Sequence, residues 1–342
     1  MSQKHSYCDF ILCFIMLYII LCNIYHVKEV KMKRILKIIG IISIVVIILF
    51  IILMICLSLK KSVPNEYWNK IESDSIIEKK YLKLGEYDVD SKRYDAPEAE
   101  DKPGKKKYYE IWYPKTQGKY PLVVMINGTG VPCNKYEDVF KHIASFGYVV
   151  IGNNYATNWD GKHPSETLDF ALNTEEIRTM IDKEKIAIGG HSQGGMGTFN
   201  AITEYDNGSM YDVAFSISPT NKELGIALEW GFELNTENAY AYLLDQINIP
   251  VMITAGTGPF ESDTVIPIEK MKEYYNELNT EKVMFRKRNV DHGDMLYQAN
   301  AYIIAWLDYY LKNIVENREA FFGDNAEINS NIYYQDFYSS EK

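Results

Sequence analysis

The stretch IAIGGHSQGGMG, from Ile186 to Gly197, places a serine between glycines directly after an apolar run. The five residues GHSQG around Ser192 have the spacing of a nucleophile elbow, in which a serine lies on a sharp turn from a strand to a helix. Glycines at both ends of the motif keep side chains away from the crowded backbone. The same pattern also occurs in turns that only pack a helix on a strand. The interpretation of Ser192 as a nucleophile therefore requires a base, an acid and an oxyanion pocket elsewhere in the chain.

The base is found by elimination among six histidines. His292 follows the serine in the chain order Ser, acid, His, and lies in NVDHGDM between a strand-like run and a helix. A surface or helix-capping histidine is the alternative interpretation. The other five are His5 and His26 in the apolar N-terminal region, His142 in an amphipathic segment, His163 in a polar loop, and His191, which would point away from the serine.

The acid is expected in the loop GTGPFESDTVIP, which follows a strand-like run at residues 250–255. Both Glu261 and Asp263 qualify. We favour Asp263 because Asp-Thr-Val-Ile-Pro leads directly into the next helix. A carboxylate there could reach a ring nitrogen of His292 and hold its tautomer. Asp263 could instead only cap that helix, and Glu261 remains a competitor.

The oxyanion pocket needs two backbone N–H groups. One is expected from Gln193, the residue after the nucleophile. The second is expected from the loop 127–130, which directly follows the apolar run YPLVVMI. We favour the N–H of Thr129, with Gly128 next. An ordinary tight turn is the alternative for this loop.

Short apolar runs alternate with amphipathic segments along the chain, which predicts an α/β fold with a mostly parallel central sheet and helices on both faces. In such sheets, ligands bind at the carboxyl ends of the strands. Strands are predicted at residues 108–113, 120–126, 148–151, 185–188, 213–217, 251–255 and 283–288, and helices at 136–146, 165–181, 194–204, 266–278 and 296–314.

From about Tyr108 to Leu311, the chain resembles the α/β-hydrolase superfamily, in its branch of dienelactone hydrolases, chlorophyllase-like proteins and cutinase-like polyester hydrolases. The segment YPLVVMINGTG resembles the strand and oxyanion loop of this branch, GGHSQGG the elbow, SDTVIP the acid loop and DHG the histidine loop. Two features depart from the pattern: Asn127 stands where His or Pro is frequent, and the acid loop is long. The resemblance implies a triad of Ser192, Asp263 and His292, with oxyanion N–H groups from Thr129 and Gln193.

These residues predict a serine hydrolase that acts on carboxylic esters through an acyl-enzyme, with no cofactor and no metal. A peptidase or an acyltransferase of the same fold is one alternative. A membrane-anchored binding protein on a degenerate hydrolase scaffold is another. The substrate is expected to be a small-molecule or polymeric ester, and we do not expect nucleic acid as a partner because the net charge is −10.

Aromatic residues after two of the predicted strands are candidates for substrate binding. Tyr155 and Trp159, in NNYATNWDG, are expected at the carboxyl edge of the sheet. The stretch 221–246 separates two strands and could form a partial lid, with Trp230 and Phe232 toward the pocket. Core packing is an equally good interpretation of each aromatic.

The N-terminal region predicts attachment to a membrane. Residues 35–59 carry one charge, Lys37, and are long enough to cross the bilayer core, so the lipid bilayer is an expected partner. Residues 10–25 form a possible extra span, and Met32 is an alternative start. Four basic residues just before the long span and two after it favour a catalytic domain outside the cytoplasm.

The rest of the chain divides into a predicted stalk or linker at residues 62–80 and a hydrolase domain with a C-terminal extension at 81–342. Cys133 is the only cysteine in this part. A single cysteine excludes an intramolecular disulfide framework and a zinc site built from cysteines.

Overall fold

The computed structural model describes residues 63–100, 106–232 and 241–341. By its internal contacts the chain divides into two units, 1–61 and 62–342. Both predicted membrane spans, 35–59 and 10–25, lie outside the described residues. Within the described ranges, no helix combines the length and the apolar character needed to cross a membrane.

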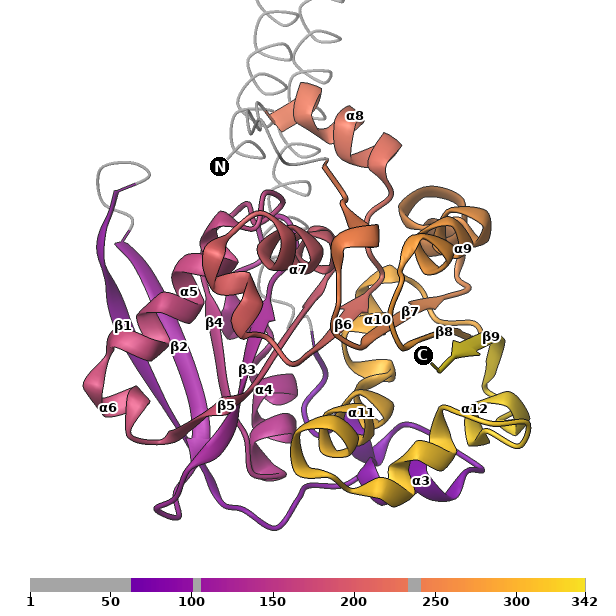
Figure 1. Ribbon diagram of the computed structural model, residues 1–342, viewed down its shortest axis with the longest axis horizontal. Helices are drawn as coiled ribbons and strands as arrows, with labels where there is room; N and C mark the ends of the chain where they lie inside the picture. The colour runs from indigo at the N-terminus through magenta and orange to yellow at the C-terminus, as the bar shows by residue number, and fades with distance from the viewer. Residues whose placement is uncertain (1–62, 101–105, 233–240, 342) are drawn as a thin grey trace, which may run out of the picture. The chain divides into compact units, whose positions relative to one another are not determined.

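The described strands form one sheet in the order β1-β2-β4-β3-β5-β6-β7-β8-β9 (Figure 1). Neighbours from β4 through β3 to β8 are parallel, and antiparallel pairing is confined to β1–β2, β2–β4 and β8–β9. The predicted parallel sheet is therefore present, with antiparallel strands at both edges. The strands are β1 Val89–Glu100, β2 Lys106–Pro114, β3 Tyr120–Ile126, β4 Val149–Asn153, β5 Ile181–His191, β6 Val213–Ile217, β7 Val251–Gly256, β8 Lys282–Lys287 and β9 Tyr334–Ser340.

Helices lie between most of the strands, as the sequence predicts. The predicted helix at 165–181 is divided at Thr174, whose backbone is extended, and the chain enters β5 at Ile181. The α-helices are α3 Ile76–Tyr81, α4 Glu137–Ser145, α5 Lys162–Asn173, α6 Glu175–Arg178, α7 Gln193–Thr203, α8 Lys222–Phe232, α9 Ile268–Glu277, α10 His292–Gln298, α11 Asn300–Lys312 and α12 Glu327–Ser330; short helical turns are η1 Tyr67–Asn69, η2 Cys133–Lys135, η3 Asp206–Met210, η4 Leu244–Gln246, η5 Glu261–Val265 and η6 Val315–Ala320.

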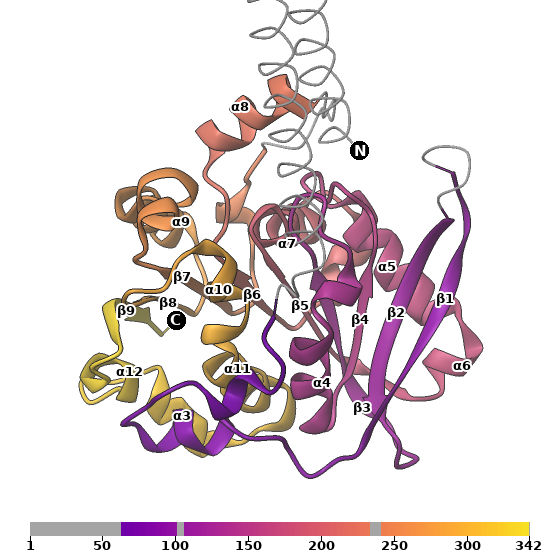
Figure 2. The ribbon, with the colours of Figure 1, turned by 180° about the vertical axis from the view of Figure 1, so that it is seen from behind.

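The sheet separates two apolar cores, because successive side chains of a strand point to opposite faces. In β3, Leu122, Val124 and Ile126 pack on one side with α5, α7 and α9. Val123 and Met125 pack on the other side with α4, α10 and α11. Figures 1 and 2 show these two helical layers from opposite directions. A strand buried on both faces explains the nearly continuous apolar run of β3.

The prediction of a linker at residues 62–80 is wrong, because this segment packs on the domain. Tyr67 and Trp68 are buried in the core beside α4. Glu78 is also fully buried. Few apolar residues and many charges made the segment resemble a stalk, but the buried charges have partners in the fold.

Glu78 joins α3 to the C-terminal part of the chain. One carboxylate oxygen accepts hydrogen bonds from Lys287 Nζ at 3.3 Å and from the Tyr334 hydroxyl at 2.6 Å. The other accepts from Asn331 Nδ2 at 2.8 Å. Burial lowers the pKa of Lys287 despite this carboxylate. A buried ion pair needs such additional hydrogen bonds to offset its loss of hydration.

His142 on α4 is buried with hydrogen bonds that fit its neutral form. Nε2–H donates to the Lys83 carbonyl at 2.8 Å, and Nδ1 accepts from the Tyr67 hydroxyl at 2.7 Å. Burial lowers the pKa of His142 from 6.5 to about 4. Between pH 6.5 and about 4, His142 is therefore protonated in the unfolded chain and neutral in the folded chain.

We expect this difference in pKa to reduce the free energy of unfolding by about 3 kcal/mol as the pH falls from about 6.5 to about 4. The His142→Gln variant should lose less stability than the wild-type chain over this pH range, although it starts from a lower value at neutral pH. Urea unfolding at about pH 7 and about pH 4.5 measures both losses. Equal losses in the two proteins would contradict the assignment.

Candidate active site

Ser192 lies at the junction of β5 and α7 with φ 62° and ψ −126°. A positive φ is strained for a serine and persists only where the surroundings enforce it. A Cβ at Gly190 would lie 2.3 Å from the Gly194 carbonyl oxygen, and one at Gly194 would lie 2.5 Å from the Ile126 oxygen. Both glycines of the motif are thus required by close backbone contacts. The turn has the geometry that the sequence predicts for a nucleophile elbow.

His292 begins α10, just after β8, and contacts both the serine and a carboxylate. Its Nε2 lies 2.9 Å from Ser192 Oγ, and its Nδ1 lies 2.6 Å from Oε2 of Glu261. Because an ionised carboxylate only accepts hydrogen bonds, Nδ1 carries the proton and Nε2 accepts from the serine hydroxyl. Side chains that follow β5, β7 and β8 therefore meet in one hydrogen-bonded row.

The carboxylate in this row is Glu261, the competitor that the sequence left open, and not Asp263, the residue that we favoured. Residues 261–265 form a π-helical turn, η5. This turn buries Glu261 completely and leaves Asp263 exposed. The position of Asp263 before the next helix does not bring its side chain to His292. Spacing in the loop could not decide between the two residues, because the direction of each side chain depends on the form of the turn.

Glu261 is held by two further donors on its other oxygen. The N–H of Gly256 donates to Oε1 at 3.1 Å, and the hydroxyl of Ser218 also donates to Oε1. Ser218 follows β6 with φ 50°. Sequence reasoning missed this serine, although its place directly after a buried strand, in Ser-Pro-Thr, is a signal for the carboxyl edge of the sheet.

Asp291 connects the acid loop to the histidine loop. Its carboxylate accepts hydrogen bonds from the backbone N–H of Glu261 at 2.8 Å, of Phe260 at 3.4 Å and of His292 at 2.8 Å. Burial acts to raise the pKa of Asp291, but the bonds from His292 and Glu261 outweigh it and lower the pKa. Asp291 thereby fixes the backbone on both sides of the bond between Glu261 and His292.

His191, the residue before Ser192, contacts His292 in two ways. The two rings stack with centroids 4.7 Å apart, and Nε2–H of His191 donates to the carbonyl of His292 at 2.9 Å. Burial, together with the neighbouring His292, lowers the pKa of His191 to about 3. A neutral ring with its proton committed to a carbonyl is unsuited to act as the base for Ser192.

The loop after β3 lies directly against the nucleophile. A Cβ at Gly128 would lie 3.2 Å from Cβ of Ser192. The N–H of Gly128 donates to the Tyr136 hydroxyl at 2.9 Å and is therefore occupied. Of the two loop residues considered for the oxyanion pocket, Gly128 is therefore less suitable, and Thr129 remains the predicted donor.

Amide side chains fix this loop to its neighbour. Asn127 Nδ2 donates to the carbonyls of Val131 at 2.6 Å and Tyr155 at 2.9 Å. The Gln193 side chain accepts from the N–H of Asn158 at 3.1 Å and donates to the Ala156 carbonyl at 2.9 Å. Asn127, the departure noted in the sequence, thus bridges the loops at residues 127–131 and 153–159.

The aromatic residues predicted to bind substrate are buried instead. Trp159 is 1% exposed and Tyr155 is 6% exposed, with its ring stacked on His163. Their burial favours core packing, the alternative that the sequence left open, over substrate binding. The side chains of Trp230 and Phe232 lie outside the described residues.

Phe260 is an exposed aromatic at the site that sequence reasoning missed. It is 53% exposed, and its ring meets the His292 ring edge-on with centroids 5.7 Å apart. Its place directly before Glu261, in the loop expected to hold the acid, is the signal that the sequence offers.

The described part of the chain contains no group of three or more His, Cys, Asp or Glu side chains arranged to hold a metal ion. Cys133 is a buried free thiol, and burial raises its pKa. A protonated, buried thiol is a poor nucleophile, so Ser192 is the better candidate in the described ranges.

Comparisons with known proteins identify a family and several relatives of this chain. The family described as Chlorophyllase matches residues 77–321. Chlorophyllase type 0 of Chenopodium album is 24% identical over 203 residues, which cover 54% of this chain and 57% of that protein. Chlorophyllase-1, chloroplastic, of Citrus unshiu is 22% identical over 224 residues, covering 60% and 65%. Cutinase est1 of Thermobifida alba is 22% identical over 214 residues, covering 59% and 64%.

The chain therefore spans between 57% and 65% of the length of these curated relatives. The family match is more extensive, since it covers well over half of the chain and includes the elbow, acid and histidine loops. Together with the parallel sheet and its covering helices, this match shows that the chain belongs to the chlorophyllase family, within the chlorophyllase and cutinase branch of the α/β-hydrolases.

Proposed function

We propose that this protein is a serine hydrolase that cleaves carboxylic esters. The observation that carries the proposal is the continuous row of hydrogen bonds from Ser192 through His292 to the buried Glu261. The names of the relatives, chlorophyllase and cutinase, support an ester substrate. The relatives differ from one another in name, so the proposal extends to the class of bond and not to one ester.

The reaction begins when His292 Nε2 takes the proton of the Ser192 hydroxyl and Oγ attacks the ester carbonyl. The N–H groups of Gln193 and Thr129 donate to the oxygen that becomes negative. Glu261 holds the ring and stabilises the imidazolium. His292 then protonates the leaving alcohol, which leaves an acyl group on Ser192. Water gives a proton to His292 and attacks this acyl group, and the proton returns to Ser192 as the acid departs.

A peptidase or acyltransferase would use the same row of residues and would differ only in the acceptor or leaving group. A binding protein on the same scaffold would not need an activated serine. The strained φ of Ser192 and the donors committed to Glu261 favour an enzyme, because these features have a cost in stability that binding alone does not require.

We also propose that residues 35–59 anchor the chain in a membrane, with the domain outside the cytoplasm. The support is the apolar length of this run and the excess of basic residues before it.

Variants of the triad should separate Glu261 from Asp263. We expect Ser192→Ala, His292→Ala and Glu261→Gln each to reduce kcat for p-nitrophenyl butyrate by roughly 10⁴-fold. Asp263→Asn is the matched control and should retain the wild-type rate, since its side chain is exposed.

Labelling of Ser192 by an alkyl fluorophosphonate gives an independent measurement on the same proteins. If the wild-type chain hydrolyses the ester and is labelled, and Ser192→Ala does neither, the result would support the proposed serine hydrolase. A wild-type chain that neither hydrolyses esters nor reacts with the phosphonate would leave the binding protein as the better explanation.

Phe260 is expected to contact the apolar part of the ester beside His292. We expect Phe260→Ala to reduce kcat/KM by about 10-fold for p-nitrophenyl octanoate, since a lost apolar contact is worth about 1.5 kcal/mol, and to change the value for p-nitrophenyl acetate much less. Tyr338→Ala, at another exposed aromatic, is the control. A reduction of the same size for both esters would argue against a contact with the acyl chain.

The membrane proposal is tested in intact cells that express the full-length chain. An added protease should digest residues 62–342, and detergent should not be needed for the digestion. Protection of the domain until the cells are lysed would contradict the proposed orientation, and release of the intact chain from membranes by alkaline carbonate would contradict the anchor.

A further inference from the structure

A cavity lies at the amino ends of the parallel strands, whereas Ser192, His292 and Glu261 lie at their carboxyl ends. Its volume is about 740 Å³, within the range of small-molecule sites. Its lining includes Tyr120, where β3 begins, and Asp182, close to the start of β5. Ser192 follows the carboxyl end of the same strand β5. The cavity therefore lies at the amino ends of the parallel strands and has no part in the proposed ester hydrolysis.

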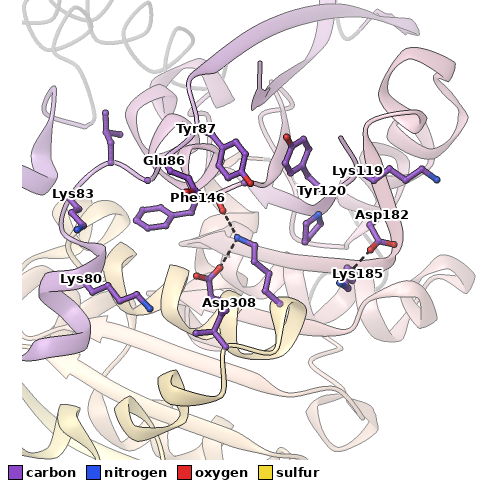
Figure 3. A pocket seen from close by; sticks show the side chains of 16 residues that line it. Lys80, Lys83, Glu86, Tyr87, Lys119, Tyr120, Phe146, Asp182, Lys185 and Asp308 are labelled. Atoms are coloured by element: carbon purple, nitrogen blue, oxygen red, sulfur yellow. Dashed lines mark hydrogen bonds and ion pairs between the residues drawn. The ribbon is translucent and has the colours of Figure 1, made fainter. Parts of the chain in front are cut away.

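Positive charge predominates in this cavity although the chain as a whole is acidic. Five lysines and three carboxylates line it, in a chain of net charge −10. Figure 3 shows lysines on two sides, with aromatic rings between them. The charged lining consists of Lys80, Lys83, Lys119, Lys185, Lys312, Glu86, Asp182 and Asp308.

The innermost charges neutralise each other. Lys312 Nζ lies 2.9 Å from Asp308, which also accepts hydrogen bonds from the hydroxyls of Tyr81 at 2.8 Å and Tyr148 at 2.7 Å. Burial lowers the pKa of Lys312 despite Asp308. Because Lys312 and Asp308 are paired with each other and Asp308 also binds two hydroxyl groups, these side chains form the base of the cavity and leave no net charge there.

The outer lysines are less fully paired. Lys185 lies 3.7 Å from Asp182. Lys80, Lys83 and Lys119 are exposed, and within the described ranges none of them forms an ion pair. Glu86 is the one lining carboxylate outside the two pairs, so the rim carries an excess of positive charge. Such an excess attracts anions to a concave surface.

The wall of the cavity is built by close backbone contacts. The N–H of Gly85 donates to Ser145 Oγ at 2.9 Å, and a Cβ at Gly85 would lie 2.2 Å from the Ser145 carbonyl oxygen. Gly147 has φ 86°, and a Cβ there would lie 2.9 Å from the ring of Tyr87. Tyr87 in turn contacts Tyr120 edge-on, with ring centroids 5.5 Å apart. These contacts fix the aromatic side of the cavity before any ligand binds.

We propose that this cavity is a binding site for a small organic anion that carries a phosphate group on a planar ring. The ring of the ligand lies against Tyr87, Tyr120 and Phe146, and the positive charge of the exposed rim lysines, Lys83 and Lys119 among them, attracts its phosphate. Lysine binds phosphate as a point charge, and aromatic side chains supply apolar contact area for the ring.

The experiment uses phenyl phosphate as the probe and calorimetry on the full-length Ser192→Ala protein. We expect saturable binding of phenyl phosphate that weakens as the salt concentration rises. Phenol, which lacks the charge, and inorganic phosphate, which lacks the ring, should each bind at least about 10-fold more weakly.

Two double variants with the same change in net charge locate the binding. Lys83→Gln with Lys119→Gln should weaken the binding of phenyl phosphate by about 10-fold or more. Lys70→Gln with Lys183→Gln, at exposed lysines outside the cavity, should leave it unchanged. Equal affinity in the two double variants, or no binding to the parent protein, would overturn the proposal.

Acetylation of lysines gives a second measurement that needs no variant. With phenyl phosphate present, Lys83 and Lys119 should react with acetic anhydride more slowly, and Lys70 should react at its former rate. Equal rates with and without the probe would also overturn the proposal. Ester hydrolysis by the wild-type chain is not needed for either measurement, so the two proposals fail independently.

Discussion

The buried carboxylate of Glu261 is the feature on which the rest of the site depends. A charged group away from water is tolerated only where hydrogen-bond donors replace its hydration. Here Gly256 and Ser218 donate to one oxygen, and His292 donates to the other. These donors come from the ends of β7, β6 and β8, so the carboxylate binds three neighbouring strand ends together. The position of His292, and with it the access of Nε2 to Ser192, follows from this arrangement.

The parallel sheet makes this convergence possible, because the carboxyl ends of its strands lie at one edge. The loops that leave these ends must still be held in one conformation. Asp291 fixes the acid loop to the histidine loop through three backbone N–H groups. Asn127 fixes the oxyanion loop to the loop after β4. The hydrogen-bonded row of Ser192, His292 and Glu261 thus rests on hydrogen bonds between loops as much as on the sheet itself.

The sequence is sufficient to predict that Ser192 and His292 lie together, because their context is set by local patterns and chain order. The bounds of β3 and β6 agree with prediction to the residue, since strands buried on both faces are continuous apolar runs. The sequence does not decide whether Glu261 or Asp263 contacts His292, because the π-helical turn determines which of the two side chains points inward. The segment 62–80 was mistaken for a linker because its buried Glu78 is stabilised by partners more than 200 residues away in sequence.

His191 illustrates how the motif contributes beyond the nucleophile. During the proposed reaction His292 becomes positively charged, and a second cation with its ring only 4.7 Å away would oppose that charge. Burial prevents this, since it lowers the pKa of His191 to about 3 and keeps the ring neutral near neutral pH. The hydrogen bond from its Nε2–H to the His292 carbonyl then positions the base without competing for the proton. The residue before the serine is therefore able to support the imidazolium because burial keeps its own ring neutral.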